Sequence, residues 1–122
     1  MDIIITNSTG EPIYTQITSQ IKAMIMNGEL KEGDALPSMR NLAAQLRISV
    51  ITTKRAYEDL ERDGFIESYT GKGSFVKAQN QEFLREESLR QIEGLLSEAS
   101  EKAKLSNISL EELKEMLDLC YE

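Results

Sequence analysis

Two helix-start signals, standing about one helix length apart, constrain the fold of this chain most. Ser38 follows Pro37 and precedes one helical pattern of apolar residues, and Ser49 precedes a second that runs to about residue 63. Serine favours the N-cap position because its side-chain oxygen accepts a hydrogen bond from a free amide of the first helical turn. Since only about three residues separate the two predicted helices, the pattern is typical of a helix-turn-helix.

The charge of this stretch differs from the charge of the whole chain. Residues 35–57 hold four Lys or Arg and no acid, although the formal net charge is −7. The acidity is uneven, because residues 1–77 carry nine Lys or Arg and ten Asp or Glu, net −1, whereas residues 78–122 carry five and eleven, net −6. Docking on nucleic acid depends on the field at the docking face more than on the total charge. Double-stranded DNA is therefore a candidate partner.

The segments on either side complete a recognisable arrangement. Residues 3–5 are three isoleucines and predict a short strand, and Pro12 is suited to the first position of a helix that Gly28 ends. After Gly64 the period of apolar residues changes from 3.6 to 2, on both sides of a glycine-rich tip at residues 71–73. A hairpin directly after the second helix would be the wing of a winged helix. We therefore predict a mainly α fold with a small β-hairpin wing (α+β).

The acidic end of the chain predicts a separate two-helix tail. We expect residues 1–77 to form the winged domain and residues 78–122 to form a short helical dimerisation domain. Ser109 and Glu112 have the spacing of a capping box at the start of the last helix. Two short amphipathic helices leave an apolar face uncovered, which could fold back on the winged domain or be buried by a second copy of the chain. We expect the second copy, through Leu89, Ile92, Leu96, Leu110, Leu113 and Leu117.

Composition argues against several other classes of protein. The chain has no histidine and one cysteine, so a Ser-His or Cys-His nucleophile is excluded, and we expect neither an enzyme nor a metal or cofactor site. No apolar run approaches the ~20 residues of a membrane span, and no signal peptide begins the chain. We therefore expect a cytoplasmic protein without a membrane partner.

The candidate DNA-contacting residues lie at the two helix starts and the hairpin tip. The first turn of the second helix would meet base edges in the major groove, where Val50 or Ile51 could touch a thymine methyl group. Each candidate also has a simpler interpretation, since Ser49 can be only a cap and the glycines only a tight turn. Arg55 could pair with Asp59 four residues on. The candidates from the residues themselves are Arg40, Ser49, Thr52, Thr53, Lys54, Gly71 and Lys72.

Five ordered segments resemble the winged-helix domain of the GntR family of transcription regulators. They are Pro12-Ile13-Tyr14-x-Gln16-Ile17, Gly33-Asp34-x-Leu36-Pro37-Ser38-x-Arg40-x-Leu42-Ala43, Ser49-x-x-Thr52-x-Lys54-Arg55-Ala56-Tyr57-x-x-Leu60, Asp63-Gly64-Phe65-Ile66 and Gly71-x-Gly73-Ser74-Phe75-Val76. The family's DNA contacts carry over to Arg40, Ser49, Thr52, Lys54, Thr70 and Gly71, with Ser38 in support at the helix start. One departure is Thr53, which stands where the family often has valine.

The short tail resembles the YtrA-like branch of that family. This resemblance implies a bacterial repressor that binds a palindromic operator as a homodimer and often controls neighbouring ABC-transporter genes. The larger effector-binding domains of other branches have no counterpart here, so no small-molecule effector is identified. The alternative is a winged-helix protein-interaction module without specific DNA binding. Salt dependence separates the two, because phosphate contacts weaken steeply with ionic strength.

Overall fold

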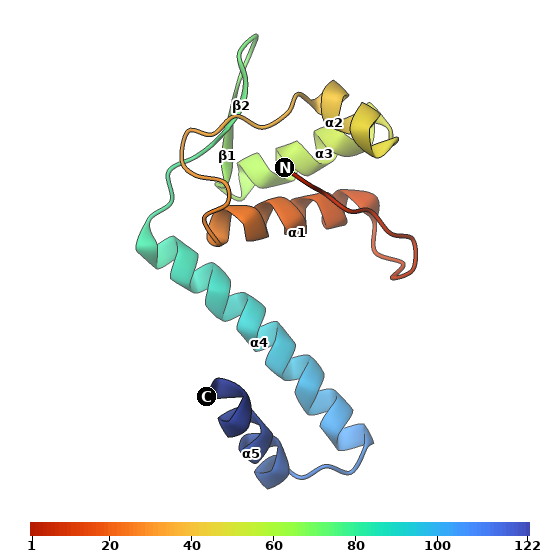
Figure 1. Ribbon diagram of the computed structural model, residues 1–122, viewed down its shortest axis with the longest axis vertical. Helices are drawn as coiled ribbons and strands as arrows, with labels where there is room; N and C mark the ends of the chain where they lie inside the picture. Colours follow the sequence, from red (N-terminus) through yellow and green to blue (C-terminus); the bar gives the residue numbers. More distant parts are fainter. The chain divides into compact units, whose positions relative to one another are not determined.

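Five helices and one β-hairpin make up the computed structural model, which describes residues 1–122 (Figure 1). The chain divides into two units, residues 1–80 and residues 81–122. The predicted mainly α fold with a hairpin wing is confirmed. The elements are α1 (Ile13–Met26), α2 (Met39–Leu46), α3 (Val50–Arg62), β1 (Ile66–Tyr69), β2 (Gly73–Val76), α4 (Gln81–Leu105) and α5 (Leu110–Tyr121).

The core of the first unit forms around α3, which contacts α1, α2 and β1. Ile17 and Ile21 of α1 lie one helical turn apart and are fully buried. They pack in the same core as Tyr57 and Leu60 of α3 and Phe65 after it, none of which is more than 1% exposed. This core fixes the position of α3, and with it the first turn of that helix.

The helix-turn-helix has the predicted caps. The side-chain oxygen of Ser38 accepts from the amide of Asn41 at 3.1 Å, and that of Ser49 accepts from the amide of Thr52 at 3.2 Å. Between them, Arg47 closes α2 in the left-handed conformation, with φ 58° and ψ 48°. A residue other than glycine rarely adopts this conformation, because its Cβ approaches the following carbonyl oxygen.

The predicted hairpin is also present. β1 and β2 are antiparallel, with Ile66 opposite Val76 and Tyr69 opposite Gly73. The turn is closed by the amide of Lys72, which donates to the carbonyl of Tyr69 at 2.9 Å. In Figure 1 the hairpin projects beyond the helices of its unit as a narrow wing.

The predicted strand at residues 3–5 is wrong. The backbone of this segment pairs with side chains of α1 and not with another strand: the amide of Ile4 donates to Gln20 Oε1 at 2.9 Å, and Gln20 Nε2 donates back to the carbonyl of Ile4 at 2.8 Å. Gln16 makes the same two-way contact with the backbone of Thr6, at 2.9 and 2.8 Å. A primary amide offers one acceptor and two donors, so it can replace a neighbouring strand. Helix α1 begins at Ile13, so Pro12 occupies the N-cap and not the first helical position that was predicted for it.

The second unit consists of α4, α5 and the break between them. Ser106–Asn107 ends α4, with Asn107 at φ 57°, and Ser109 caps α5 by accepting from the amide of Glu112 at 3.2 Å. Ala103 is the buried residue of this unit, and the large apolar side chains of both helices are mostly exposed. None of the helices combines the length and the apolar character that a membrane crossing requires.

Candidate nucleic-acid interface

The start of α2 and the wing line one open hollow of about 510 Å³. Ser38 and Arg40 contribute from the helix, and Thr70 and Gly71 contribute from the tip of the wing. Four of the predicted site residues are therefore brought together, although about 30 residues of sequence separate the two pairs. Arg40 is exposed in the first turn of α2, beside free backbone amides that also favour an anion.

The first turn of α3 presents a second group of predicted residues. Ser49 and Lys54 are exposed, and Thr52 is half-buried with its hydroxyl 2.9 Å from that of Ser49. Lys54 lies 4.0 Å from Glu58, and both side chains are about two-thirds exposed. Because an exposed pair of this kind contributes at most about 1 kcal/mol, Lys54 stays available to a phosphate.

Thr53 does not belong to this surface. Its side chain is 0% exposed, and its hydroxyl donates to the carbonyl of Ser49 at 3.3 Å within α3. The helical period explains the burial, because Thr53 lies on the same face as Ala56, Tyr57 and Leu60 of the core. A thymine, an adenine or a phosphate cannot reach it, so we remove Thr53 from the candidate contacts.

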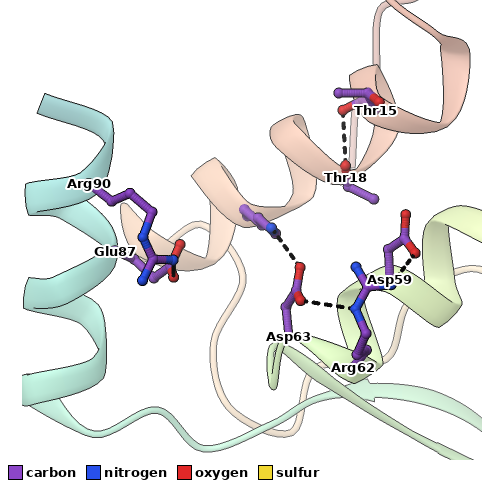
Figure 2. Close-up of polar contacts among 8 residues, drawn as sticks. Thr15, Thr18, Asp59, Arg62, Asp63, Glu87 and Arg90 are labelled. Atoms are coloured by element: carbon purple, nitrogen blue, oxygen red, sulfur yellow. Dashed lines mark hydrogen bonds and ion pairs between the residues drawn. The ribbon is translucent and has the colours of Figure 1, made fainter. Parts of the chain in front are cut away.

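Two cations of α3 are engaged within the protein. The guanidinium of Arg55 lies 3.8 Å from the centre of the Tyr14 ring, a cation–π contact that joins α3 to α1. The predicted partner Asp59 instead pairs with Arg62 at 3.0 Å (Figure 2). Spacing alone misled the prediction for Arg55, because the aromatic ring lies 41 residues away in the sequence.

The C-terminal end of α3 holds an ion-pair network around Asp63. Its carboxylate accepts from Lys22 at 3.0 Å and lies 3.4 Å from Arg62. Burial alone would raise the pKa of Asp63, but the hydrogen bond from Lys22 and the charges of Lys22 and Arg62 lower it below its usual range. This network fastens α3 to α1 at the end of the helix opposite to Ser49, Thr52 and Lys54.

The wing tip leaves its backbone accessible. Thr70, Gly71 and Lys72 are exposed, and apart from Gly71 and its two chain neighbours no residue lies within 4 Å of the place where a Cβ on Gly71 would stand. Gly71 is therefore required for its positive φ of 78° and not for close packing. Beside the tip, a hydrogen bond to Glu67 and the charge of that carboxylate raise the pKa of the exposed Tyr69.

One hydrogen bond that positions the candidate interface could not be predicted from the sequence pattern. The hydroxyl of Tyr57 donates to the carbonyl of Pro37 at 2.7 Å, and so connects α3 to the residue before the N-cap of α2. Burial raises the pKa of this phenol far above its usual range, so the hydroxyl keeps its proton. The only sign of this hydrogen bond in the sequence is a tyrosine at a core position, because a buried hydroxyl needs a partner.

The surface has the shape and the charge of a DNA reader, with one acidic exception. Arg40, Arg47, Lys54 and Lys72 are exposed on α2, α3 and the wing, and the fold adds Glu61 to the lining of the hollow. The helix-turn-helix places a capped helix start, free amides and cations where a groove of DNA can meet them. Fold and surface together define a winged helix-turn-helix DNA-binding protein.

Comparison with known proteins is decisive for the family. The model of the bacterial regulatory proteins of the gntR family matches residues 13–76, which is more than half of the chain. The chain therefore belongs to the GntR family of DNA-binding transcription regulators, and not to a family of enzymes. The matched residues run from the start of α1 to the end of β2, so the family model spans the winged unit.

Individual relatives resemble the chain over most of its length. The transcriptional repressor YtrA of Bacillus subtilis is 35% identical over 87% of this chain and 82% of its own length. The structure of YtrA from Sulfolobus acidocaldarius, a GntR-family transcription factor, is 33% identical with a TM-score of 0.60, covering 98% of this chain and 96% of that one. The DNA-binding domain of AraR, in complex with operator ORX1, is 26% identical with a TM-score of 0.53, covering 62% of this chain and 92% of that one.

Proposed function

We propose that the chain is a repressor that binds an inverted-repeat operator as a homodimer. The observation that carries the proposal is the convergence of Ser38 and Arg40 with Thr70 and Gly71 on one open hollow, together with the exposed Ser49 and Lys54 at the capped start of α3. The likeness to the B. subtilis repressor, and the solved complex of a related domain with operator DNA, support it. The proposed contacts are Ser38, Arg40, Ser49, Thr52, Lys54, Thr70, Gly71 and Lys72.

The second unit supports the homodimer. Leu89, Ile92, Leu96 and Leu117 are each between 48% and 50% exposed, and Leu110 is 63% exposed. A groove of about 380 Å³ between α4 and α5 is lined almost entirely by apolar side chains, Leu113 among them. Apolar side chains left in water are stabilised when a partner covers them, by ~25 cal/mol per Å². A second copy of residues 78–122 would bury these faces and place two winged domains, residues 1–77, on one DNA duplex.

The proposed location and the proposed target genes rest on the resemblance to the YtrA-like branch. We propose that the repressor acts in the cytoplasm and controls an operon for an ABC transporter. The two-unit division of the chain supports separate roles for the winged unit and the tail. An inverted repeat with half-sites about one helical turn apart suits a two-fold symmetric dimer.

DNA binding is tested by fluorescence anisotropy. The probes are a duplex from upstream of the protein's own gene and a scrambled duplex of equal length. We expect tighter binding to the native duplex, and log Kd that rises with log salt by roughly 0.9 per phosphate contact. Equal, salt-insensitive behaviour toward both probes would refute the proposal and favour a protein-interaction module.

Arg40→Ala sharpens this test. The side chain is exposed, so we expect an unchanged fold and weaker binding to the native duplex. Lys31→Ala is the matched control, because it removes one positive charge from the exposed loop between α1 and α2. An equal loss in both variants would mean that only total charge matters, and no loss in either would remove Arg40 from the contacts.

The homodimer is tested by sedimentation of variants of the second unit. Leu96→Glu places a charge on the apolar groove and should give a monomer that binds the native duplex weakly. Ser97→Glu adds the same charge to the neighbouring exposed residue and should leave the dimer intact. Truncation after Lys77 should also give a monomer. A truncated protein that still dimerises would contradict the tail interface.

A further inference from the structure

Two aliphatic side chains at the start of α3 face solvent. Val50 is 45% exposed and Ile51 is 80% exposed, and they are the exposed large hydrophobic residues of helices α1 to α3. The other large aliphatic side chains of these three helices are at least half-buried. Exposed large aliphatic side chains in these three helices therefore occur only in the first turn of α3.

The position of Ile51 within α3 explains its exposure. The buried face of the helix contains Thr53, Ala56, Tyr57 and Leu60. At 100° per residue, Ile51 points almost directly opposite to the mean direction of that face. Folding gains nothing from this side chain, and a β-branched residue is a slightly worse helix former than alanine. The role of the Ile51 side chain must therefore lie outside the folded core.

The polar groups of the same turn are already paired. The Ser49 and Thr52 hydroxyls lie 2.9 Å apart, and the Ser49 oxygen also accepts from the amide of Thr52. The cation Lys54 follows one turn later and is exposed. The surface that would enter a groove is thus apolar at Val50 and Ile51 and bordered by positive charge. Among the four bases, thymine alone presents a methyl group in the major groove.

We propose that Ile51, with Val50 beside it, reads the C5-methyl group of a thymine in each half-site of the operator. The inference rests on the proposed function, and it specifies that function by fixing an A·T pair at one symmetric position. Ile51 acts as a specificity-determining residue, while Arg40 and Lys54 supply affinity through charge. The chemistry is the burial of one methyl group against an aliphatic side chain, with no hydrogen bond.

The size of the effect follows from that burial. Replacing thymine by uracil removes the methyl group and preserves every hydrogen-bonding atom of the base. Loss of one buried methyl should weaken binding roughly fourfold, which corresponds to about 0.8 kcal/mol. Replacement in both half-sites should weaken binding roughly fifteenfold, since the two sites are separate.

The experiment begins with selection of bound sequences from a random duplex library by the full chain. Each thymine of the selected half-site is then replaced symmetrically by uracil, and affinity is measured by anisotropy at fixed salt. The parent protein should lose affinity at one thymine position. Ile51→Ala should bind the thymine duplex more weakly and lose nothing further with uracil at that position. Ile4→Ala, in which an isoleucine that is 76% exposed is truncated elsewhere in the same unit, should keep the full uracil penalty.

The possible outcomes distinguish a failure of thymine reading by Ile51 from a failure of the proposed DNA binding. A selected operator without a uracil-sensitive thymine would overturn the inference and leave DNA reading intact. A uracil penalty that persists in Ile51→Ala would also overturn it, because another residue would then be reading the methyl group. Failure to enrich any sequence would refute the proposed function together with the inference. Since Ile51 is exposed, thermal unfolding of Ile51→Ala should match that of the parent.

Discussion

The hydroxyl of Tyr57 offers a direct test of how the core positions the DNA-binding surface. Tyr57→Phe removes one oxygen and leaves the ring in place, so it creates no sizeable cavity. The carbonyl of Pro37 then loses its 2.7 Å hydrogen bond. A buried acceptor without a partner costs about 1–3 kcal/mol. Because Pro37 is only half-buried, we expect the lower part of that range, about 1–2 kcal/mol.

This loss should be visible in both unfolding and binding. In a domain of this size a destabilisation of 1 kcal/mol lowers Tm by about 4–8 °C. The variant should also bind the native duplex more weakly below its Tm, because the broken bond holds the residue before the Ser38 cap and hence the start of α2. Urea unfolding, followed by far-UV circular dichroism, should give a lower midpoint with an unchanged slope.

The control for this variant is another tyrosine of the same unit. Tyr14→Phe keeps the ring that lies against Arg55 and should change the free energy of unfolding by less than about 0.5 kcal/mol. Protein concentration is held equal in all samples, because dimerisation would make Tm depend on it. Equal midpoints for Tyr57→Phe and the parent would refute the reasoning that this hydrogen bond fastens α2 to α3.

Three further predictions concern other parts of the first unit. Lys22→Gln should lower stability by less than about 1 kcal/mol at neutral pH, as measured by urea midpoints. The folded-state pKa of Asp63 lies below its usual value of 3.8, so this stabilisation is present above about pH 4 and is lost as pH falls through the folded pKa. A difference between Lys22→Gln and the parent that does not shrink as the pH is lowered would contradict the assignment. Gln16→Leu should speed hydrogen exchange at the amide of Thr6, which loses its 2.9 Å bond, and unchanged protection there would show that another group holds the segment. Gly71→Ala should lower the free energy of unfolding by about 1 kcal/mol, as measured by urea midpoints, and equal stability would mean that the turn accepts a side chain at positive φ.

The sequence allowed most of this fold to be predicted, because its decisive signals are local. A serine cap needs only the amide three residues on, so Ser38, Ser49 and Ser109 could be identified before the structure was known. The change of period after Gly64 likewise revealed the hairpin.

The errors arose where a distant residue decides the structure. Residues 3–5 form no strand, because Gln20 pairs with the backbone of Ile4 and Gln16 pairs with that of the adjoining Thr6. Arg55 contacts Tyr14, which no helical spacing could reveal. Thr53 is a different case, because its polarity suggested the surface although the local helical period of α3 places it in the core. The same period places Ile51 on the opposite, exposed face of α3.

The left-handed Arg47 has a consequence for how such a regulator can adapt to temperature. Its conformation costs on the order of 1 kcal/mol relative to glycine, which would adopt the same φ freely. Exchange to glycine should raise thermal tolerance and remove an exposed positive charge from the turn between α2 and α3. The exchange of Arg47 to glycine should therefore raise thermal stability and weaken the electrostatic attraction to DNA. The thermal stability of this protein can therefore be changed at this turn without any change to its core.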